Sequence, residues 1–218
     1  MKIQEKLNLL YKLLDNFYGD LKWWPAETPF EVCVGAILTQ NTNWTNVEKA
    51  IKNLKEKNLL TYKKLIEIDT EQLKRLIKPA GFYNQKAERI KIFCDFVDKK
   101  LDGDILSLKK FSIEDAREML LSLKGVGKET ADSILLYALD FKIFVVDAYT
   151  MRLFKRYGVG DYDNYDKCQD FVHKNFRGDL YEYKNFHACI VELCKSYCKK
   201  KPLCNFCILK KYCNKNIE

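Results

Sequence analysis

The most constraining feature of the sequence is a Gly-Val-Gly turn at residues 125–127, which separates two segments of helical patterning. Glycine relieves the strain of a tight turn and lets the backbone approach a ligand closely. We therefore expect a helix-hairpin-helix here. The N–H groups and the positive end of its second helix, with Lys124 and Lys128 beside them, would form a site for a phosphate.

An acid follows this hairpin after a long apolar stretch. The second helix carries apolar residues on one face, and residues 144–146 are apolar as well, so that Asp147 emerges from apolar surroundings. A carboxylate in such a place is a candidate catalytic group. Asp147 also stands where it could cap a helix that begins at Ala148, and the two roles are compatible.

The composition is compatible with a helical protein that binds a polyanion. The 218 residues include only nine Gly and four Pro, which favours helices over turn-rich β architecture. Lys and Arg together number 38 against 30 Asp and Glu, a net charge of +8 that permits a nucleic-acid partner without requiring one. Residues 1–18 do not resemble a signal peptide, and no apolar run approaches about 18 residues. We expect no membrane span and a cytoplasmic location, nucleoid-associated in a prokaryote.

Residues 123–131, with Asp147 beyond them, resemble the hairpin and the catalytic aspartate of the endonuclease III superfamily of DNA glycosylases. The pattern of that family is roughly Leu-Pro-Gly-Val-Gly-x-Lys-Thr-Ala followed by Val-Asp, so hairpin and acid agree in sequence and in spacing. Residues 77–87 are also similar to the family's Gly-Leu/Phe-Tyr-Asn-x-Lys-Ala loop. The resemblance implies that Asp147 is the catalytic residue.

The resemblance also implies an all-α, two-lobed helix-hairpin-helix DNA glycosylase fold with a C-terminal iron–sulfur loop. A helical barrel that contains the hairpin would span residues 26–141. The second helical lobe would consist of residues 1–25 and 142–218, and a cleft between the lobes would hold Asp147. The partner would be double-stranded DNA with a damaged or mismatched base, bound by a monomer.

An enzyme of this kind must extrude the target nucleotide and fill the hole it leaves. By resemblance, Gln40 would enter that gap, and Phe82 would be an apolar wedge between base pairs. The alternatives are a helix C-cap for Gln40 and an aromatic that anchors a loop to the core for Phe82. The expected DNA contacts are Gln40, Phe82, Lys124, Gly125, Val126, Gly127 and Lys128.

Position 129 distinguishes two reactions. Bifunctional members of the family carry a lysine there, whose amine forms a Schiff base and then cleaves the strand by elimination, but this chain has Glu129. Lys128 is adjacent, yet one residue turns a helical side chain by about 100° and would aim it at phosphates instead. We therefore expect hydrolysis by water and a monofunctional glycosylase. A bifunctional glycosylase/AP lyase that uses another lysine, and a non-catalytic DNA-binding protein, are the alternatives.

The tryptophans lie in the two stretches where the family builds its base pocket, and we expect Trp23, Trp24, Pro25 and Trp44 to line it. The Trp-Trp-Pro sequence looks more like the 3-methyladenine glycosylase III type than endonuclease III proper, while archaeal-type uracil glycosylases share much of the pattern. Electron-rich rings favour a cationic alkylated purine, but they stack on any base. Core packing would also account for them, so an alkylated purine and a uracil-type lesion both stay open.

Four of the nine cysteines form a C-x5-C-x2-C-x5-C cluster near the C-terminus, and four thiolates in so short a stretch can hold one metal centre. Structural zinc usually takes paired Cys-x-x-Cys knuckles, so an iron–sulfur cluster fits better. The segment also resembles the family's [4Fe-4S] loop, although its first gap is five residues rather than six, and Cys194 competes as first ligand. The expected ligands are Cys198, Cys204, Cys207 and Cys213, and the exposed lysines around them would face phosphates.

We expect His187 and the remaining candidate core cysteines to have structural rather than functional roles. His187 lies in the last expected helix without an accompanying nucleophile motif, so we expect it to pack or to make a satisfied hydrogen bond. Four further cysteines are expected in the core: Cys33, Cys94, Cys168 and Cys189.

Overall fold

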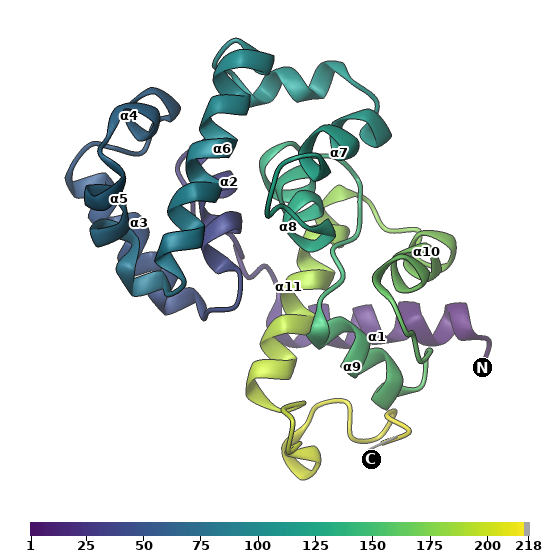
Figure 1. The fold of residues 1–218 in the computed structure, drawn as a ribbon. Coiled ribbons are helices and arrows are strands. Elements are labelled where there is room, and N and C mark those ends of the chain that lie inside the picture. Colours follow the sequence, from purple (N-terminus) through teal and green to yellow (C-terminus); the bar gives the residue numbers. More distant parts are fainter. Residues whose placement is uncertain (216–218) are drawn as a thin grey trace. The chain divides into compact units, whose positions relative to one another are not determined.

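The structure is a computed structural model that describes residues 1–215. Over these residues the chain is helical and contains no strand, which confirms the predicted all-α class (Figure 1). The chain divides into two compact units, one made of Met1–Pro25 with the chain from Lys142 onward, the other of Ala26–Phe141. Residues 216–218, the end of the expected second lobe, lie outside the described residues.

The unit of Ala26–Phe141 is organised around a buried helix, α2. Every residue from 31 to 38 of this helix is buried, and α2 packs against α3, α6 and the π-helical turn η3. Pro29 at the first position and Thr28, whose hydroxyl accepts the Glu31 N–H at 3.1 Å, begin the helix. The helices of this unit are α2 (Pro29–Thr39), α3 (Trp44–Glu56), α4 (Tyr62–Glu67), α5 (Thr70–Ile77), η1 (Lys78–Ala80), α6 (Tyr83–Leu101), η2 (Ile105–Lys110), α7 (Ile113–Leu121), α8 (Lys128–Ser133) and η3 (Ile134–Ala138).

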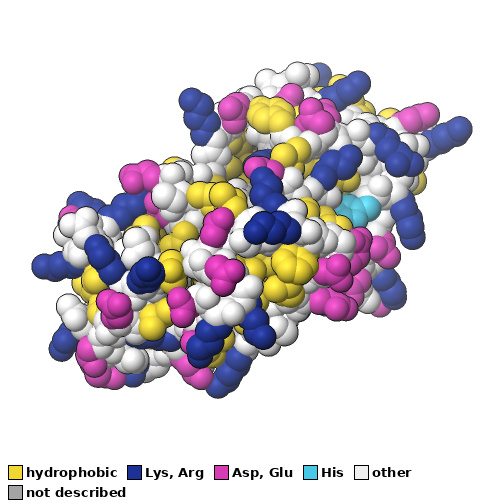
Figure 2. Space-filling view, turned by 90° about the horizontal axis from the view of Figure 1, so that it is seen from above, with side chains coloured by type: hydrophobic (Ala, Val, Ile, Leu, Met, Phe, Trp, Pro, Cys, Tyr) yellow, Lys and Arg dark blue, Asp and Glu magenta, His cyan; other side chains and the backbone are white. Residues whose placement is uncertain are grey.

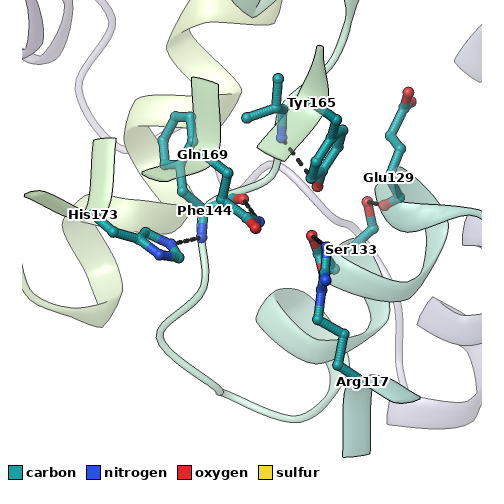
Figure 3. A network of polar contacts seen from close by, with 9 residues as sticks. Arg117, Glu129, Ser133, Phe144, Tyr165, Gln169 and His173 are labelled. Atoms are coloured by element: carbon teal, nitrogen blue, oxygen red, sulfur yellow. Dashed lines mark hydrogen bonds and ion pairs between the residues drawn. The ribbon is translucent and has the colours of Figure 1, made fainter. Parts of the chain in front are cut away.

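The expected helix-hairpin-helix is formed by α7 and α8. The hydroxyl of Ser112 accepts the Asp115 N–H at 3.0 Å and caps α7. Arg117 on α7 donates to both carboxylate oxygens of Asp132 on α8, at 2.6 and 3.0 Å (Figure 3). Because Asp132 is fully buried, this two-point ion pair fixes the two helices against each other.

The other unit is built on an aromatic core. The buried ring of Phe186 lies 5.0–6.3 Å, centroid to centroid, from the rings of Tyr11, Phe144, Phe154 and Phe176. These residues come from α1, α9, α11 and the segments between the helices, so the core joins both ends of the chain. The helices are α1 (Ile3–Tyr18), α9 (Ala148–Tyr157), α10 (Tyr165–Asn175), α11 (Leu180–Ser196) and η4 (Cys204–Phe206).

Basic side chains do not form one continuous field on the face seen in Figure 2, where Lys and Arg alternate with Asp and Glu. The net charge of +8 therefore does not by itself mark a binding surface there. Within the described part of the chain, no helix is both long and apolar enough to cross a membrane.

Candidate functional site

The hairpin turn is shaped by Gly125 for two separate reasons. Its φ angle of +85° lies in the left-handed region that favours glycine. A Cβ added there would also stand 2.3 Å from Nε of Arg89, whose side chain reaches from α6 over the turn. Val126 is buried, and its N–H closes the turn on the Leu123 carbonyl at 3.0 Å. Gly125 is thus required by the fold itself.

Gly127 is different, because neither its backbone nor its neighbours require glycine. It is the N-cap of α8 with extended backbone, φ −93° and ψ 176°. Among the described residues, no heavy atom outside its chain neighbours lies within 4 Å of a Cβ built at this position. The bare, exposed backbone at the start of α8 leaves room for a ligand that approaches closely.

The two lysines beside the turn are both exposed. Lys124 forms an ion pair with Glu88 on α6, with Nζ and Oε1 2.6 Å apart. Hydrogen bonding and charge from Lys124 lower the pKa of the Glu88 carboxyl. Glu129, in the first turn of α8, is exposed like Lys128, and its backbone carbonyl accepts the Ser133 hydroxyl at 2.7 Å (Figure 3).

Gln40 lies in direct contact with the hairpin. It is the C-cap residue of α2, as the alternative interpretation proposed, but its side chain also reaches the turn. Its Nε2 donates to the Gly125 carbonyl and to the Thr130 hydroxyl, each at 2.9 Å. Its Oε1 accepts a hydrogen bond from Arg89 of α6. The sequence did not indicate Arg89, which both covers Gly125 and holds Gln40.

Phe82 is 60% exposed, which does not fit an aromatic that anchors the loop in the core. Its backbone is left-handed, with φ 45° and ψ 31°, an uncommon conformation for a bulky residue. Gly81 before it also has a positive φ, of 69°. The turn that precedes α6 therefore presents an aromatic ring outward on a strained backbone.

The carboxylate of Asp147 is fixed by α9 and faces a histidine. Its Oδ1 accepts the Thr150 N–H at 2.7 Å and the Thr150 hydroxyl at 2.9 Å, so Asp147 caps α9. Its Oδ2 lies 3.5 Å from Nε2 of the buried His187 on α11. Burial raises the pKa of this carboxyl, but His187 and the Thr150 hydrogen bonds outweigh burial and lower the pKa below its usual value. His187 packs edge-on against Phe144, as a packing residue would, yet it also faces Asp147.

One face of α10 holds the segment of residues 144–146, which leads to Asp147 and belongs to no helix. The Phe144 N–H donates to Nε2 of His173 at 3.0 Å, Nε2 of Gln169 donates to the Phe144 carbonyl at 2.6 Å, and the Val146 N–H donates to the Tyr165 hydroxyl at 3.3 Å. Figure 3 shows the His173 and Gln169 side chains directed at the Phe144 backbone. These polar side chains recur every four residues on α10, a spacing that could have revealed the face from the sequence.

The four clustered cysteines line one cavity in the unit that contains α9. Cys198, Cys204, Cys207 and Cys213 surround it together with Arg156 and several apolar residues. Arg156 donates to the carbonyl oxygens of residues 198–200 and, at 3.5 Å, to Sγ of Cys198. Within residues 1–215, no three Cys, His, Asp or Glu side chains are close enough together to hold a single metal ion.

Cys194, the competing first ligand, lies on α11 and does not line this cavity. Its Sγ lies 3.6 Å from the Tyr149 carbonyl. A hydrogen bond from Cys194 lowers the pKa of Cys198, burial opposes this shift, and Arg156 reinforces it. The expected core cysteines are buried, and burial raises their pKa: Cys33, Cys94, Cys168 and Cys189.

The expected pocket residues fall into both units. Trp23 is half-buried, and Nζ of Lys195 lies 5.5 Å from its ring centroid. Trp24 is half-buried and Pro25 exposed. Trp44, at the start of α3 in the other unit, is half-buried and donates Nε1 to Glu48 at 3.0 Å. None of the three tryptophans is fully buried.

Comparisons with known proteins agree with this architecture. The family model described as HhH-GPD superfamily base excision DNA repair protein matches residues 34–177. A Methanocaldococcus jannaschii protein with the provisional name DNA repair glycosylase MJ1434 is 51% identical over 219 residues, which covers 96% of each chain. The chain therefore belongs to the HhH-GPD superfamily of base excision DNA repair proteins, and the predicted family is confirmed.

Two solved structures show the same fold. The crystal structure of H. pylori 3-methyladenine DNA glycosylase (MagIII) bound to 1,N6-ethenoadenine is similar with a TM-score of 0.77 and 32% identity, covering 89% of this chain and 98% of that one. A non-covalent endonuclease III–DNA complex has a TM-score of 0.83 at 23% identity, covering 99% and 97%. The second likeness concerns the fold alone.

Proposed function

We propose that this protein is a monofunctional DNA glycosylase, which extrudes a damaged base from duplex DNA and hydrolyses its N-glycosidic bond with water. The observation that carries the proposal is the Asp147 carboxylate. Thr150 fixes one of its oxygens, its pKa is lowered so that it is ionised at neutral pH, and the other oxygen faces His187. Breaking the bond develops positive charge on the sugar, which a fixed carboxylate stabilises while it orients the attacking water.

The variant Asp147→Asn tests this role, because asparagine caps a helix about as well as aspartate and keeps its shape. We expect base release to fall by about 10²-fold or more while affinity for duplex DNA stays within about threefold. Base release from lesion-bearing duplexes is measured by alkaline cleavage of the abasic sites formed. Unchanged base release would contradict the assignment of Asp147, and absence of release from every duplex by the wild type would contradict the enzyme.

The monofunctional reaction is supported by Glu129, which occupies the lysine position of the bifunctional pattern and is exposed on α8. Without an amine there, no Schiff base forms at this position. We expect no adduct when the wild type is incubated with abasic DNA and borohydride, and a covalent adduct when Glu129→Lys is treated alike. An adduct with the wild type would favour the glycosylase/AP lyase alternative.

We propose that the lesion is an alkylated purine or a uracil-type base, and that Trp23, Trp24, Pro25 and Trp44 form the base pocket, as the family resemblance implies. The name of the MagIII relative, a 3-methyladenine DNA glycosylase, supports the alkylated purine. A panel of duplexes that carry one modified base each, 1,N6-ethenoadenine and uracil among them, separates the two. The two units would be the two lobes expected from the sequence, and the partner would be duplex DNA bound by a monomer in the cytoplasm.

Cys198, Cys204, Cys207 and Cys213 would hold a [4Fe-4S] cluster. Their donor set of four thiols around one cavity fits such a group. Thiolates on a single zinc ion stand about 3.8 Å apart, whereas a four-iron cluster gives each thiolate its own iron and suits a wider cavity. The cluster has no part in the proposed hydrolysis. It would fix a segment whose exposed lysines face phosphates: Lys199, Lys200, Lys201, Lys210 and Lys211.

A further inference from the structure

Lys86, on the second turn of α6, is a buried lysine that the proposed reaction does not use. Its side chain is fully buried, and burial lowers its pKa to about 8, with a smaller contribution from Arg89. Its Nζ donates to the carbonyl oxygens of Leu38 and Ala80, each at 2.8 Å. Both acceptors are backbone groups of other elements, so the ammonium acts as a fixed link between them.

Each of the two linked carbonyls lies two residues before an expected DNA contact. Leu38 is two residues before Gln40, and Ala80 is two residues before Phe82. Gln40 and Phe82 are the two residues proposed to occupy the opened duplex. One ammonium thus ties the end of α2, which carries the first, to the turn that carries the second.

We infer that Lys86 is a positioning residue that holds the Gln40 and Phe82 turns as one rigid element, so that both side chains enter the DNA together. The inference rests on the proposed function, because it assigns a role to residues that act only on a duplex with an extruded base. Lys86 itself is buried and is not expected to contact DNA.

The conformation of the Phe82 turn needs such support. Phe82 exposes its ring on a left-handed backbone, and a strained conformation persists only where its surroundings hold it. Nζ of Lys86 lies 6.0 Å from the Phe82 ring centroid. Gln40 is held from the same helix by Arg89, three residues after Lys86 and on the same helical face. Without Lys86, Arg89 would still hold Gln40 against α6, but the carbonyls of Leu38 and Ala80 would lose their shared donor, and the Phe82 turn would lose its link to α2.

The test uses a duplex in which 2-aminopurine stands next to a tetrahydrofuran abasic-site analogue, because its fluorescence rises when the stack is opened and requires no base release. At saturating protein we expect Lys86→Met to lose at least half of the wild-type fluorescence change. Lys86→Arg, which keeps the charge and several donors, should recover most of it, and Lys86→Gln, with a single amide, should lie between.

Lys91→Met is the matched control. Lys91 lies on the same helix, and its Nζ also donates to two backbone carbonyls, those of Ile66 and Ile68, which precede no proposed DNA contact. We expect this variant to lower thermal stability to a similar degree but to leave the fluorescence change within about a fifth of wild type. An equal loss in the two variants would reduce Lys86 to a stabilising residue and overturn the inference.

Base release gives a second readout. On the lesion that the duplex panel identifies, Lys86→Met should release base from duplex at least tenfold more slowly, but from the single-stranded oligonucleotide at nearly the wild-type rate. Gln40→Ala and Phe82→Ala should be non-additive in the wild type and additive in Lys86→Met. Equal losses on both substrates would contradict the inference, whereas a wild type that releases no base from either would contradict the proposed function instead.

Discussion

The two glycines of the hairpin look equivalent in the sequence, but the structure gives each position a different physical explanation. Gly125 has a positive φ and is covered by Arg89, so the fold of the free protein requires it. Gly127 has an extended backbone and open space around it. The fold therefore does not require glycine at Gly127, and we expect the missing side chain to matter for the close approach of a phosphate.

Substitution of Gly127 by alanine should separate binding from stability. Gly→Ala lowers the entropy of the unfolded chain, which stabilises the fold, but alanine is a poorer N-cap. The two effects offset each other, so we expect the free energy of unfolding to stay within about 1 kcal/mol of the wild-type value. Duplex affinity should fall by about tenfold, because the Cβ keeps a phosphate from the N–H groups of α8. Filter binding and thermal unfolding measure the two effects.

Gly125→Ala serves as the comparison for this prediction. It should destabilise the protein by more than about 1 kcal/mol, since it combines a strained φ with a clash on Arg89. Equal affinity of Gly127→Ala and wild type would show that no phosphate approaches the turn closely.

The lowered pKa of Asp147 predicts how its contribution to stability depends on pH. The folded pKa lies below the unfolded value of about 3.9, so the ionised carboxylate stabilises the fold above that pH, and the contribution disappears as the pH falls through the folded pKa. Asp147→Asn should therefore unfold more easily than wild type at pH 7, by about 1 kcal/mol, and the difference should shrink below pH ~4. Thermal unfolding from pH 3 to 7 measures it; a difference independent of pH would contradict the ionic contribution.

At the scale of elements, side chains of α10 provide the hydrogen-bond partners for the backbone of residues 144–146. Residues 144–146 belong to no helix, so their buried backbone groups need hydrogen-bond partners from elsewhere in the molecule. Tyr165, Gln169 and His173 supply those partners from one face of a helix. The position of Asp147, directly after this segment, thus depends on side chains from a helix that follows it in the chain.

The variant Gln169→Met tests this dependence, because it keeps the volume of the side chain but leaves the buried Phe144 carbonyl without its donor. We expect a loss of about 1–3 kcal/mol in the free energy of unfolding and a kcat about tenfold lower at nearly unchanged KM. Lys142→Met, which removes a donor to the Gly178 carbonyl at the start of the same segment, should leave kcat unchanged. A rise in KM alone would place the effect in binding rather than in the position of the acid.

The elements could be predicted from the sequence wherever their signals are local. Asp69 and Ser112 cap α5 and α7, and Asp147 caps α9, each by a bond to a residue three positions later. The apolar residues on almost every side of α2 likewise predict that the whole helix is buried. Phe17 continues the helical spacing of the apolar residues Leu7, Leu10 and Leu14, which predicts burial, but it is 52% exposed in the last turn of α1.

Contacts between distant residues could not be predicted in this way. Gln40 and Gly125 are 85 positions apart, and Lys86 and Leu38 are 48 apart. No residue pattern predicted that His187 would face Asp147. The spacing of apolar residues predicts which face of a helix is buried. The partner of a polar side chain depends instead on how the helices pack against one another, and residue spacing within a helix carries no information about that packing.

At the scale of the whole molecule, the cysteine segment closes the unit formed by both chain ends. Lys6 of α1 donates to Asn214 at 2.7 Å, and the Asn214 N–H donates to the Tyr157 carbonyl at 3.4 Å. Arg156 holds the segment at its other end, near Cys198. The segment is thus attached to α1 and to the last turn of α9.

Two serine variants test whether Cys198 or Cys194 is the first ligand of the proposed cluster. Cys198→Ser should lose the absorbance band near about 400 nm that a [4Fe-4S] protein shows, because Cys198 lines the cavity. Cys194→Ser should keep the band, since that thiol lies outside it. The reverse pattern would make Cys194 the ligand, and bound zinc without a band in the wild type would exclude the cluster.

Helix α9 lies between the proposed catalytic acid, Asp147, and the contact that Arg156 makes with the cysteine segment. Asp147 stands at its first turn and Arg156, which grips the cysteine segment, at its last, and ten residues at 1.5 Å each span about 15 Å. The cavity that the four cysteines line meets α9 at Leu153 and Arg156, in the half of the helix away from Asp147. A cluster held in that cavity would brace the C-terminal half of α9, and its removal is expected to loosen the helix that Asp147 caps.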